Sequence, residues 1–378
     1  MTNLKEIYEG RRQKMAAWLK ENDVAAVAFV DGEEHRSPCV RYFSGHPTDA
    51  TLVIDQKGDA ILIPWDENLA KERASVTKII PLTRYERNKF NALKGALTTL
   101  KIKEKSKVEI PTGTSYPDFL HYVDALSGYD VLCREKGAEQ KASELRMIKD
   151  EYEIACIRKA AAITDELMDM LEAGVRNGSI TTESDAALLI EKECRARGCE
   201  GTGFDTLAAG PARSWAIHCF PPYTGGEFGT TGLSILDFGV VYEGYTSDCT
   251  MTFARGPLTK AQEDQLALVQ QCYDETIPLY AAGLPVRAPA VKADEVFAAK
   301  KRSMPHSLGH SFGLECHEYP VTRVKLNQEV VFEPGMVITC EPGLYDAEIG
   351  GCRLENDVLI TENGGEVITH SRIVRIDC

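Results

Sequence analysis

Acidic residues stand inside strand patterns that are otherwise apolar, and this feature constrains the fold of the chain most strongly. In ILDFGVVYEGYTSDCTMTF, residues 235–253, Asp237 and Asp248 lie on either side of Glu243-Gly244, which marks a turn. We expect this turn to place the two carboxylates nearly opposite each other on adjacent strands, where directly opposed side chains lie ~5 Å apart at Cβ. Burying two unpaired carboxylates is costly, so the hairpin predicts a positive charge between them.

A second hairpin later in the chain repeats the pattern. Glu341 ends the apolar stretch GMVITCEPG, and Glu355 stands in the following strand, GCRLENDVLIT. Strand alternation puts Arg353 and Glu355 on one face. A solvated sheet face is the alternative interpretation, but the neighbours of these acids are too apolar for a face that meets water. We therefore expect all four acids in the interior.

The segment HSLGHSFGLECHE, residues 306–318, holds three of the eight histidines. Histidine fills half-buried positions in many proteins, but it is also the commonest metal ligand and the usual acid–base group near neutral pH. Four carboxylates with one imidazole suit a hard or borderline divalent ion such as manganese or cobalt. Because four carboxylates exceed the needs of one ion, we expect two ions, which together activate water and stabilise the attacking and leaving atoms. Strand alternation turns the thiols of Cys249 and Cys340 away from this site.

Length and the order of the expected elements indicate two domains. At 378 residues the chain is long for one domain. Residues 1–135 alternate helix and strand patterns, which predicts a compact α/β domain, and the polar segment from Arg134 marks its end. In residues 136–378, two helix patterns and a hairpin occur twice, and the first long helix is expected to end at Gly174. This repetition favours two halves related by an internal pseudo-twofold, although accidental α+β alternation would give the same order.

Charge and composition exclude several classes of protein. The formal net charge of −14 argues against a nucleic-acid partner, which requires a basic face. The N-terminus lacks the apolar core of a signal peptide, and the chain has no apolar run long enough to span a membrane. We therefore expect a cytoplasmic protein. The twelve cysteines include no Cys-x-x-Cys pair, and we expect most of them to be reduced and packed as small apolar residues.

The motifs LDFG, TSDCTMTF, SLGHSFGLECHE, CEPGLY and CRLEND together resemble the metallopeptidase superfamily of methionine aminopeptidase, aminopeptidase P, prolidase and creatinase. The resemblance covers essentially the full length and implies an α+β fold. A pita-bread catalytic domain with an internal pseudo-twofold, residues 136–378, would follow a smaller α/β creatinase-like N-terminal domain, residues 1–135. The resemblance also implies two divalent ions per chain, manganese first, with cobalt or zinc as alternatives. The implied ligands are Asp237, Asp248, His310, Glu341 and Glu355.

The resemblance further implies which of the two ions each residue would bind. Asp248 and Glu355 would bridge the two ions, with Asp237 completing the shell of one ion and His310 and Glu341 completing that of the other.

Residues around the ligands have implied catalytic roles as well. Glu341 would also accept a proton, and His218 and His317 would contact substrate and stabilise developing charge. Arg353 matches a basic residue that supports the bridging glutamate. His306 matches no catalytic position, and we interpret it as structural.

The stretches YFSGH, residues 42–46, and SLGHSFGLECHEYP resemble the proline-specific branch, prolidase and aminopeptidase P. That branch implies hydrolysis of the X-Pro bond of dipeptides or short peptides by a homodimer. Arg323 is our candidate for binding the free carboxylate of a dipeptide, because a planar guanidinium matches a carboxylate; an ordinary surface arginine is the alternative. The sequence departs from the branch at Ser311, where glycine often follows the ligand histidine, and in ARSWAIHCF around His218.

Three other functions remain open at this point. The chain could be an Xaa-Pro aminopeptidase acting on longer peptides, or an amidohydrolase of the same superfamily acting on a small metabolite. A non-catalytic binding protein is the third, and the complete ligand set disfavours it, because binding modules on this fold have generally lost metal ligands.

Overall fold

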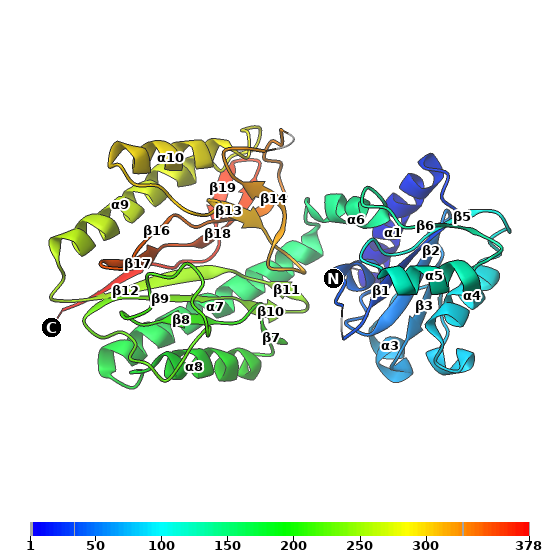
Figure 1. Ribbon diagram of the computed structural model, residues 1–378, viewed down its shortest axis with the longest axis horizontal. Coiled ribbons are helices and arrows are strands. Elements are labelled where there is room, and N and C mark those ends of the chain that lie inside the picture. Colours follow the sequence, from blue (N-terminus) through cyan, green and yellow to red (C-terminus); the bar gives the residue numbers. More distant parts are fainter. Residues whose placement is uncertain (1–2, 34, 327–328, 378) are drawn as a thin grey trace. The chain divides into compact units, whose positions relative to one another are not determined.

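The computed structural model describes residues 3–33, 35–326 and 329–377. The chain divides into two compact units, Met1–Arg146 and Met147–Cys378 (Figure 1). Helix α6 (Ala138–Arg146), which we expected beyond a boundary at 135/136, lies in the first unit. It contacts α1 (Leu4–Glu21) and buries alanines.

A six-stranded sheet with the order β4-β3-β2-β1-β5-β6 forms the centre of the first unit. Its strands are mostly buried and pack against helices that flank the sheet. The remaining elements of this unit are β1 (Ala26–Asp31), α2 (Pro38–Ser44), β2 (Ala50–Asp55), β3 (Ala60–Pro64), α3 (Glu67–Arg73), β4 (Lys78–Ile79), η1 (Leu82–Tyr85), α4 (Lys89–Thr99), β5 (Lys107–Glu109), α5 (Tyr116–Ala125) and β6 (Asp130–Leu132).

The second unit repeats an order of two helices followed by strands, as the sequence predicted. Its first half holds α7 (Glu151–Asn177), α8 (Glu183–Ala196), β7 (Gly201–Thr202), β8 (Leu207–Ala209), β9 (Gly232–Phe238), β10 (Val240–Tyr242), β11 (Tyr245–Thr246) and β12 (Cys249–Arg255). Its second half holds α9 (Lys260–Thr276), η2 (Ile277–Leu279), α10 (Ala288–Ala299), β13 (Gly309–Ser311), β14 (Glu318–Thr322), β15 (Val337–Cys340), β16 (Gly343–Asp346), β17 (Gly350–Arg353), β18 (Asn356–Thr361), β19 (Gly364–Val367) and β20 (Ile373–Ile376).

Each helix pair of the second unit covers the strands of its own half. Leu167 of α7 and Ile190 of α8 pack in one core with Leu236 of β9. Helices α9 and α10 pack in another core with β15 and β18. In Figure 1 the green helices α7 and α8 and the yellow helices α9 and α10 therefore lie on opposite sides of the strands. Asp237 lies in β9, and Asp248, Glu341 and Glu355 lie directly beside the ends of β12, β15 and β18.

The first long helix pattern is two helices rather than one, and the expectation that it ends at Gly174 is wrong. Asp150 caps a new helix through a capping box with Glu153, which separates α6 from α7. Helix α7 continues to Asn177 and ends at Gly178, whose φ of 79° is left-handed. Gly174 lies inside α7. A Cβ at this position would lie 2.6 Å from Ile180 Cδ1, so the glycine permits Ile180 to pack closely against the helix.

Candidate metal centre and active site

The two halves of the second unit meet at Thr250, in β12, and Glu355, just before β18. The backbone N–H of Glu355 donates to the carbonyl oxygen of Thr250 at 3.2 Å, and the Thr250 hydroxyl donates to Glu355 Oε2 at 2.7 Å. Both residues are buried. This contact brings the strands that carry the first pair of acids against the strands that carry the second pair.

The register of β9 and β12 differs from the one that the sequence suggested. Asp237 lies opposite Thr250, so Asp237 and Asp248 are diagonal neighbours rather than directly opposed. The turn at Glu243-Gly244 is present, but it closes the short β10–β11 hairpin. The β10–β11 pairs and the β9–β12 pairs follow one register, so counting outward from the two-residue turn places Asp237 opposite Thr250.

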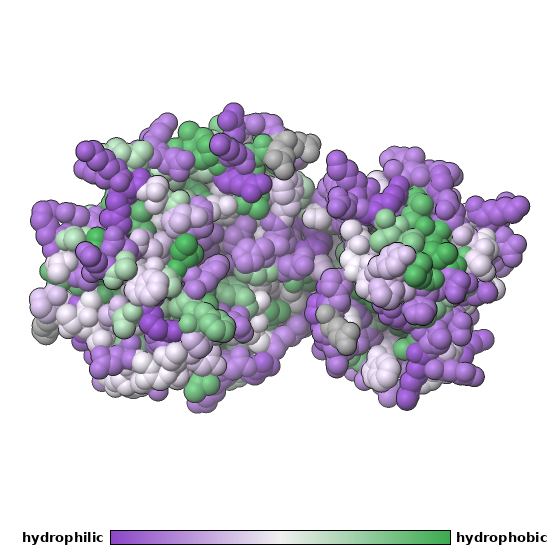
Figure 2. All heavy atoms as spheres, viewed as in Figure 1, coloured by the Kyte–Doolittle hydropathy of each residue, from purple (hydrophilic) through white to green (hydrophobic). Residues whose placement is uncertain are grey.

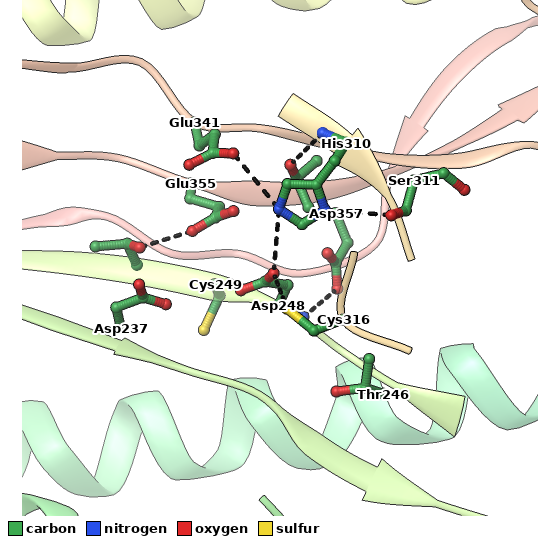
Figure 3. Close-up of polar contacts among 12 residues, drawn as sticks. Asp237, Thr246, Asp248, Cys249, His310, Ser311, Cys316, Glu341, Glu355 and Asp357 are labelled. Atoms are coloured by element: carbon green, nitrogen blue, oxygen red, sulfur yellow. Dashed lines mark hydrogen bonds and ion pairs between the residues drawn. The ribbon is translucent and has the colours of Figure 1, made fainter. Parts of the chain in front are cut away.

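His310, in β13, points its ring toward acids from both halves (Figure 3). Its Nε2 atom lies 3.7 Å from Asp248 Oδ2 and 3.6 Å from Glu341 Oε1. Ligand atoms of Asp248, His310 and Glu355 all lie within 4.8 Å of one another. Two atoms bonded to one cation at ~2.1 Å lie no more than ~4.2 Å apart, so the two short distances from Nε2 suit a shared cation.

Asp237 has an unsatisfied oxygen that suits a cation. Its Oδ2 atom accepts a hydrogen bond from Arg353 Nη2 at 2.5 Å. Its Oδ1 atom is buried and has no hydrogen-bond partner among the residues that the structure describes. Because a buried carboxylate oxygen without a partner is costly, this atom favours a site completed by a bound positive charge. The oxygen-rich donor set with one imidazole fits a divalent ion of the hard or borderline kind.

Arg353 connects the acids to a loop that carries His218. Its buried guanidinium donates to Thr250 Oγ1 at 2.8 Å as well as to Asp237, and Thr250 in turn contacts Glu355. A further N–H donates to the carbonyl oxygen of Ile217 at 3.1 Å. Arg353 thereby orients Asp237 directly and Glu355 through Thr250. It also holds the backbone beside His218.

Burial and mutual repulsion perturb the pKa of the acids. Burial raises the pKa of Asp248 and Glu355 well above their usual values, and neighbouring carboxylates raise them further. Burial raises the pKa of Glu341 to about 8, although the charge of Arg353 opposes the shift. Burial and the nearby His317 lower the pKa of His310 to about 4, so this imidazole is neutral and its lone pair is available near pH 7. A bound cation would favour the ionised carboxylates and reverse the shifts of the acids.

The two candidate catalytic histidines lie at the exposed side of the cluster. His317 is exposed, and its ring centroid lies 4.3 Å from that of His310. His218 is exposed as well. Partial burial of its ring lowers its pKa, the charge of Arg353 lowers the pKa further, and the charge of Asp237 opposes this shift. His306 contacts the Tyr345 hydroxyl through Nε2 at 3.0 Å, beside the cluster rather than between the acids.

Arg323 directly follows β14 and is exposed. In β14, Val321 lies opposite His310, and alternation puts Arg323 on the same face as Val321. Within the described part of the chain, Arg323 makes no ion pair. The side chain is therefore available to a ligand on the His310 side of the sheet.

The thiols of the two strand cysteines point away from the acids, as alternation predicted. Figure 3 shows Cys249 directed away from Asp248, and its Sγ contacts the Phe238 carbonyl oxygen at 3.4 Å. Cys340 is buried in the core beneath α9, with Sγ 3.4 Å from Thr276 Oγ1.

Two residues that contact the acids were not predicted from the sequence. Asp357 Oδ2 accepts the backbone N–H of Asp248 at 3.1 Å, and Cys316 Sγ donates to Asp248 Oδ2 at 3.3 Å (Figure 3). Asp357 is an acid in an apolar strand two residues after Glu355, so the criterion that identified the other acids would have found it. Cys316 offers no comparable signal, because its contact depends on the path of the 313–318 loop.

Comparison with known proteins identifies relatives of the whole chain. The profile of "Metallopeptidase family M24" matches residues 155–362. An Xaa-Pro dipeptidase of Pyrococcus horikoshii is 28% identical over 371 residues, which cover 96% of this chain and 98% of that one.

Solved structures agree with this result. The prolidase of Pyrococcus furiosus superposes with a TM-score of 0.78 at 26% identity, covering 94% of this chain and 99% of that one. The X-Pro aminopeptidase of Thermotoga maritima gives a TM-score of 0.82 at 24% identity, covering 97% and 99% respectively, and at that identity it speaks for the fold. These neighbours confirm the α+β pita-bread fold. In the described ranges, none of the helices has the length and apolar character needed to cross a bilayer.

Proposed function

Because the chain belongs to metallopeptidase family M24, we propose that it is a metal-dependent hydrolase that cleaves the X-Pro bond of dipeptides. The convergence of acids from both halves on His310, with Asp237 Oδ1 buried and unsatisfied, is the observation that carries this proposal. The similarity to the dipeptidase of P. horikoshii over nearly the full length supports the substrate class.

The residues that would hold two divalent ions, manganese in the first instance, are the five predicted ligands. Asp237 and Asp248 from the first half and His310, Glu341 and Glu355 from the second half would together supply the oxygen and nitrogen donors. When bound, divalent ions supply positive charge that makes a water molecule more acidic and polarises the scissile carbonyl.

The remaining steps are assigned to side chains of this chain. Glu341 would accept the proton released by the attacking water, as an ionised carboxylate beside His310. His218 and His317 are exposed beside the cluster and would donate hydrogen bonds to developing charge and to the leaving imide nitrogen. Arg353 would keep Asp237 and the His218 loop in place.

Arg323 decides between dipeptides and longer peptides in this proposal. Its guanidinium has no ion pair within the described residues and would bind the free carboxylate of proline. Such a contact contributes ~1.5–3 kcal/mol, or about a 10- to 150-fold effect on kcat/KM. Ala-Pro should therefore be cleaved much better than Ala-Pro-Ala or Ala-Pro-amide, and Arg323→Ala should remove that preference without changing metal content.

The experiment that tests the function is a panel of X-Pro peptides and amides with manganese added. Elemental analysis should approach two ions per chain, and a chelator should abolish activity that manganese restores. Full activity in thoroughly metal-stripped protein would contradict the proposal. Preference for Ala-Pro-Ala would instead assign the chain to the Xaa-Pro aminopeptidases, whose representative from T. maritima shares this fold. Cleavage of amides but of no X-Pro peptide would favour an amidohydrolase.

We further propose a cytoplasmic homodimer. Light scattering should then give about twice the chain mass of 41.7 kDa. A monomer at micromolar concentration would contradict this part of the proposal and leave the catalytic assignment intact.

A further inference from the structure

The loop that carries His218 presents three aromatic side chains to solvent. Trp215 is 47% exposed, Phe220 is 93% exposed and Tyr223 is 38% exposed. We call these three residues the aromatic rim. Large aromatic side chains normally contribute to cores or interfaces, so this concentration on one loop requires an explanation. The face of the second unit drawn in Figure 2 is mostly hydrophilic, with small separate apolar patches.

The backbone beneath the rim is held by buried polar contacts. The carboxylate of Glu183, which is 1% exposed, accepts hydrogen bonds from Arg213 Nη2 and from the Thr224 backbone N–H, each at 2.8 Å. Arg213 Nη1 donates to the Pro221 carbonyl oxygen at 2.9 Å, and Ser214 Oγ accepts the Gly351 N–H at 3.1 Å. These contacts fix the loop at both ends and in its middle, so the exposed rings stand on a preorganised support.

The same loop is tied to the acids of the candidate metal centre. Arg353 binds Asp237 with one N–H and the Ile217 carbonyl oxygen with another. Consecutive residues span at most ~3.6 Å each, so the Cα of Phe220 is within ~7 Å of the Cα of His218 and that of Trp215 is within ~11 Å. The rim therefore lies on the same loop as the histidine that faces substrate in the proposed function, within two to five residues of it along the chain.

We propose that the aromatic rim binds the side chain of the residue before proline and selects large apolar side chains at that position. This inference rests on the proposed X-Pro dipeptidase function. The rigid support means that substrate binding does not have to order the loop, so more of the contact energy appears as affinity. A small residue such as glycine would leave the rings in water and gain nothing from them.

The test compares kcat/KM for Phe-Pro, Leu-Pro, Ala-Pro and Gly-Pro with manganese present. Wild type should favour Phe-Pro over Gly-Pro by at least about 10-fold, in line with apolar pockets that distinguish side chains by size. Phe220→Ala and Trp215→Ala should each lower the Phe-Pro to Gly-Pro ratio severalfold, and Phe220→Leu should retain most of it. Calorimetric titration of metal-stripped protein with Phe-Pro should show the same order of affinities, independently of turnover.

Leu188→Ala is the matched control, because Leu188 is 58% exposed on α8 and lies outside the rim. This variant should keep the wild-type ratio. If the ratio of kcat/KM for Phe-Pro to that for Gly-Pro is the same in wild type, Phe220→Ala and Trp215→Ala, the inference is wrong, whereas the dipeptidase function is unaffected. Conversion of a dimer to a monomer by Phe220→Ala would assign the ring to a second copy of the chain and would also overturn it. Hydrolysis of no X-Pro peptide would reject the proposed function first.

Discussion

Lys149 carries its ammonium group into the interior of the second unit, where its side chain is 0% exposed. The ammonium donates to Ser311 Oγ at 2.8 Å and to Glu318 Oε2 at 3.3 Å. Ser311 follows His310 and Glu318 follows His317, so one lysine binds the side chains of the residues that follow both histidines. The serine that departs from the glycine common in related sequences thus has a partner of its own.

Replacing Lys149 by methionine should destabilise the protein strongly, because it removes the buried positive charge that pairs with the Glu318 carboxylate. Loss of one member of a buried ion pair typically costs about 3–5 kcal/mol, measured here as the free energy of unfolding in urea. Adding Glu318→Gln to Lys149→Met should recover part of that loss. Lys260→Met is the control, because its partner Asp264 and the lysine itself are exposed and such pairs contribute ~0–1 kcal/mol. A Lys149→Met protein as stable as wild type would contradict this account.

At the scale of elements, β13 lies unusually close to its neighbour β15. A Cβ at Gly309 would lie 1.9 Å from the carbonyl oxygen of Thr339. Only glycine permits this approach, and the approach sets the position of His310, the next residue. The distance between two backbones therefore determines where a predicted metal ligand stands.

Gly309→Ala should push β13 away from β15 and lower both stability and metal affinity. Overpacking of this kind typically costs about 1–3 kcal/mol in the free energy of unfolding. Isothermal titration with manganese should show weaker binding than wild type. Gly10→Ala, in α1, is the control: nothing lies within 4 Å of a Cβ there, and alanine should stabilise the helix by ~0.5–1 kcal/mol. Unchanged manganese affinity in Gly309→Ala would show that β13 tolerates the shift.

Some of these elements could be predicted from sequence and others could not, for physical reasons. The cost of burying a carboxylate leaves a local signal, so Asp237 and Glu341 stand out in apolar strands. The Thr182 capping box with Asp185 is likewise local, and it marks the start of α8. The register of β9 and β12 is local as well, because it follows from counting outward from the turn at Glu243-Gly244. The contact between Cys316 and Asp248 is different, because it joins residues 68 positions apart and depends on how the two halves pack.

At the scale of the whole molecule, the buried acids link stability to pH and to metal. Without metal, the folded protein retains the proton of Glu341 up to about pH 8, whereas the unfolded chain releases it near the ordinary value of 4.5. The folded state then binds this proton between these values, so the contribution of Glu341 to stability is full below about pH 4.5 and is lost as pH rises toward 8. Asp248 and Glu355, whose pKa is also raised by burial, act in the same direction.

His306 and His310, whose pKa is lowered from 6.5 by burial, act in the opposite direction only below about pH 6.5. The melting temperature of metal-stripped protein should therefore decrease as pH rises from about 6.5 to 8, and added manganese should raise it most at the upper end. Glu341→Gln should flatten the decrease, because an amide does not titrate. Differential scanning calorimetry at several pH values with and without manganese measures both effects. A melting temperature of stripped protein that rises between about pH 6.5 and 8 would contradict the assigned direction.

The contact between Thr250 and Glu355 spans 105 residues of sequence. During synthesis, the carboxylates of the first hairpin emerge from the ribosome long before the glutamate that meets them. A nascent chain must therefore keep Asp237 and Asp248 hydrated, or neutral, until the second half has been made and docked. Because a coordination site rarely exists before folding, ion capture in this protein would report the final assembly of its halves.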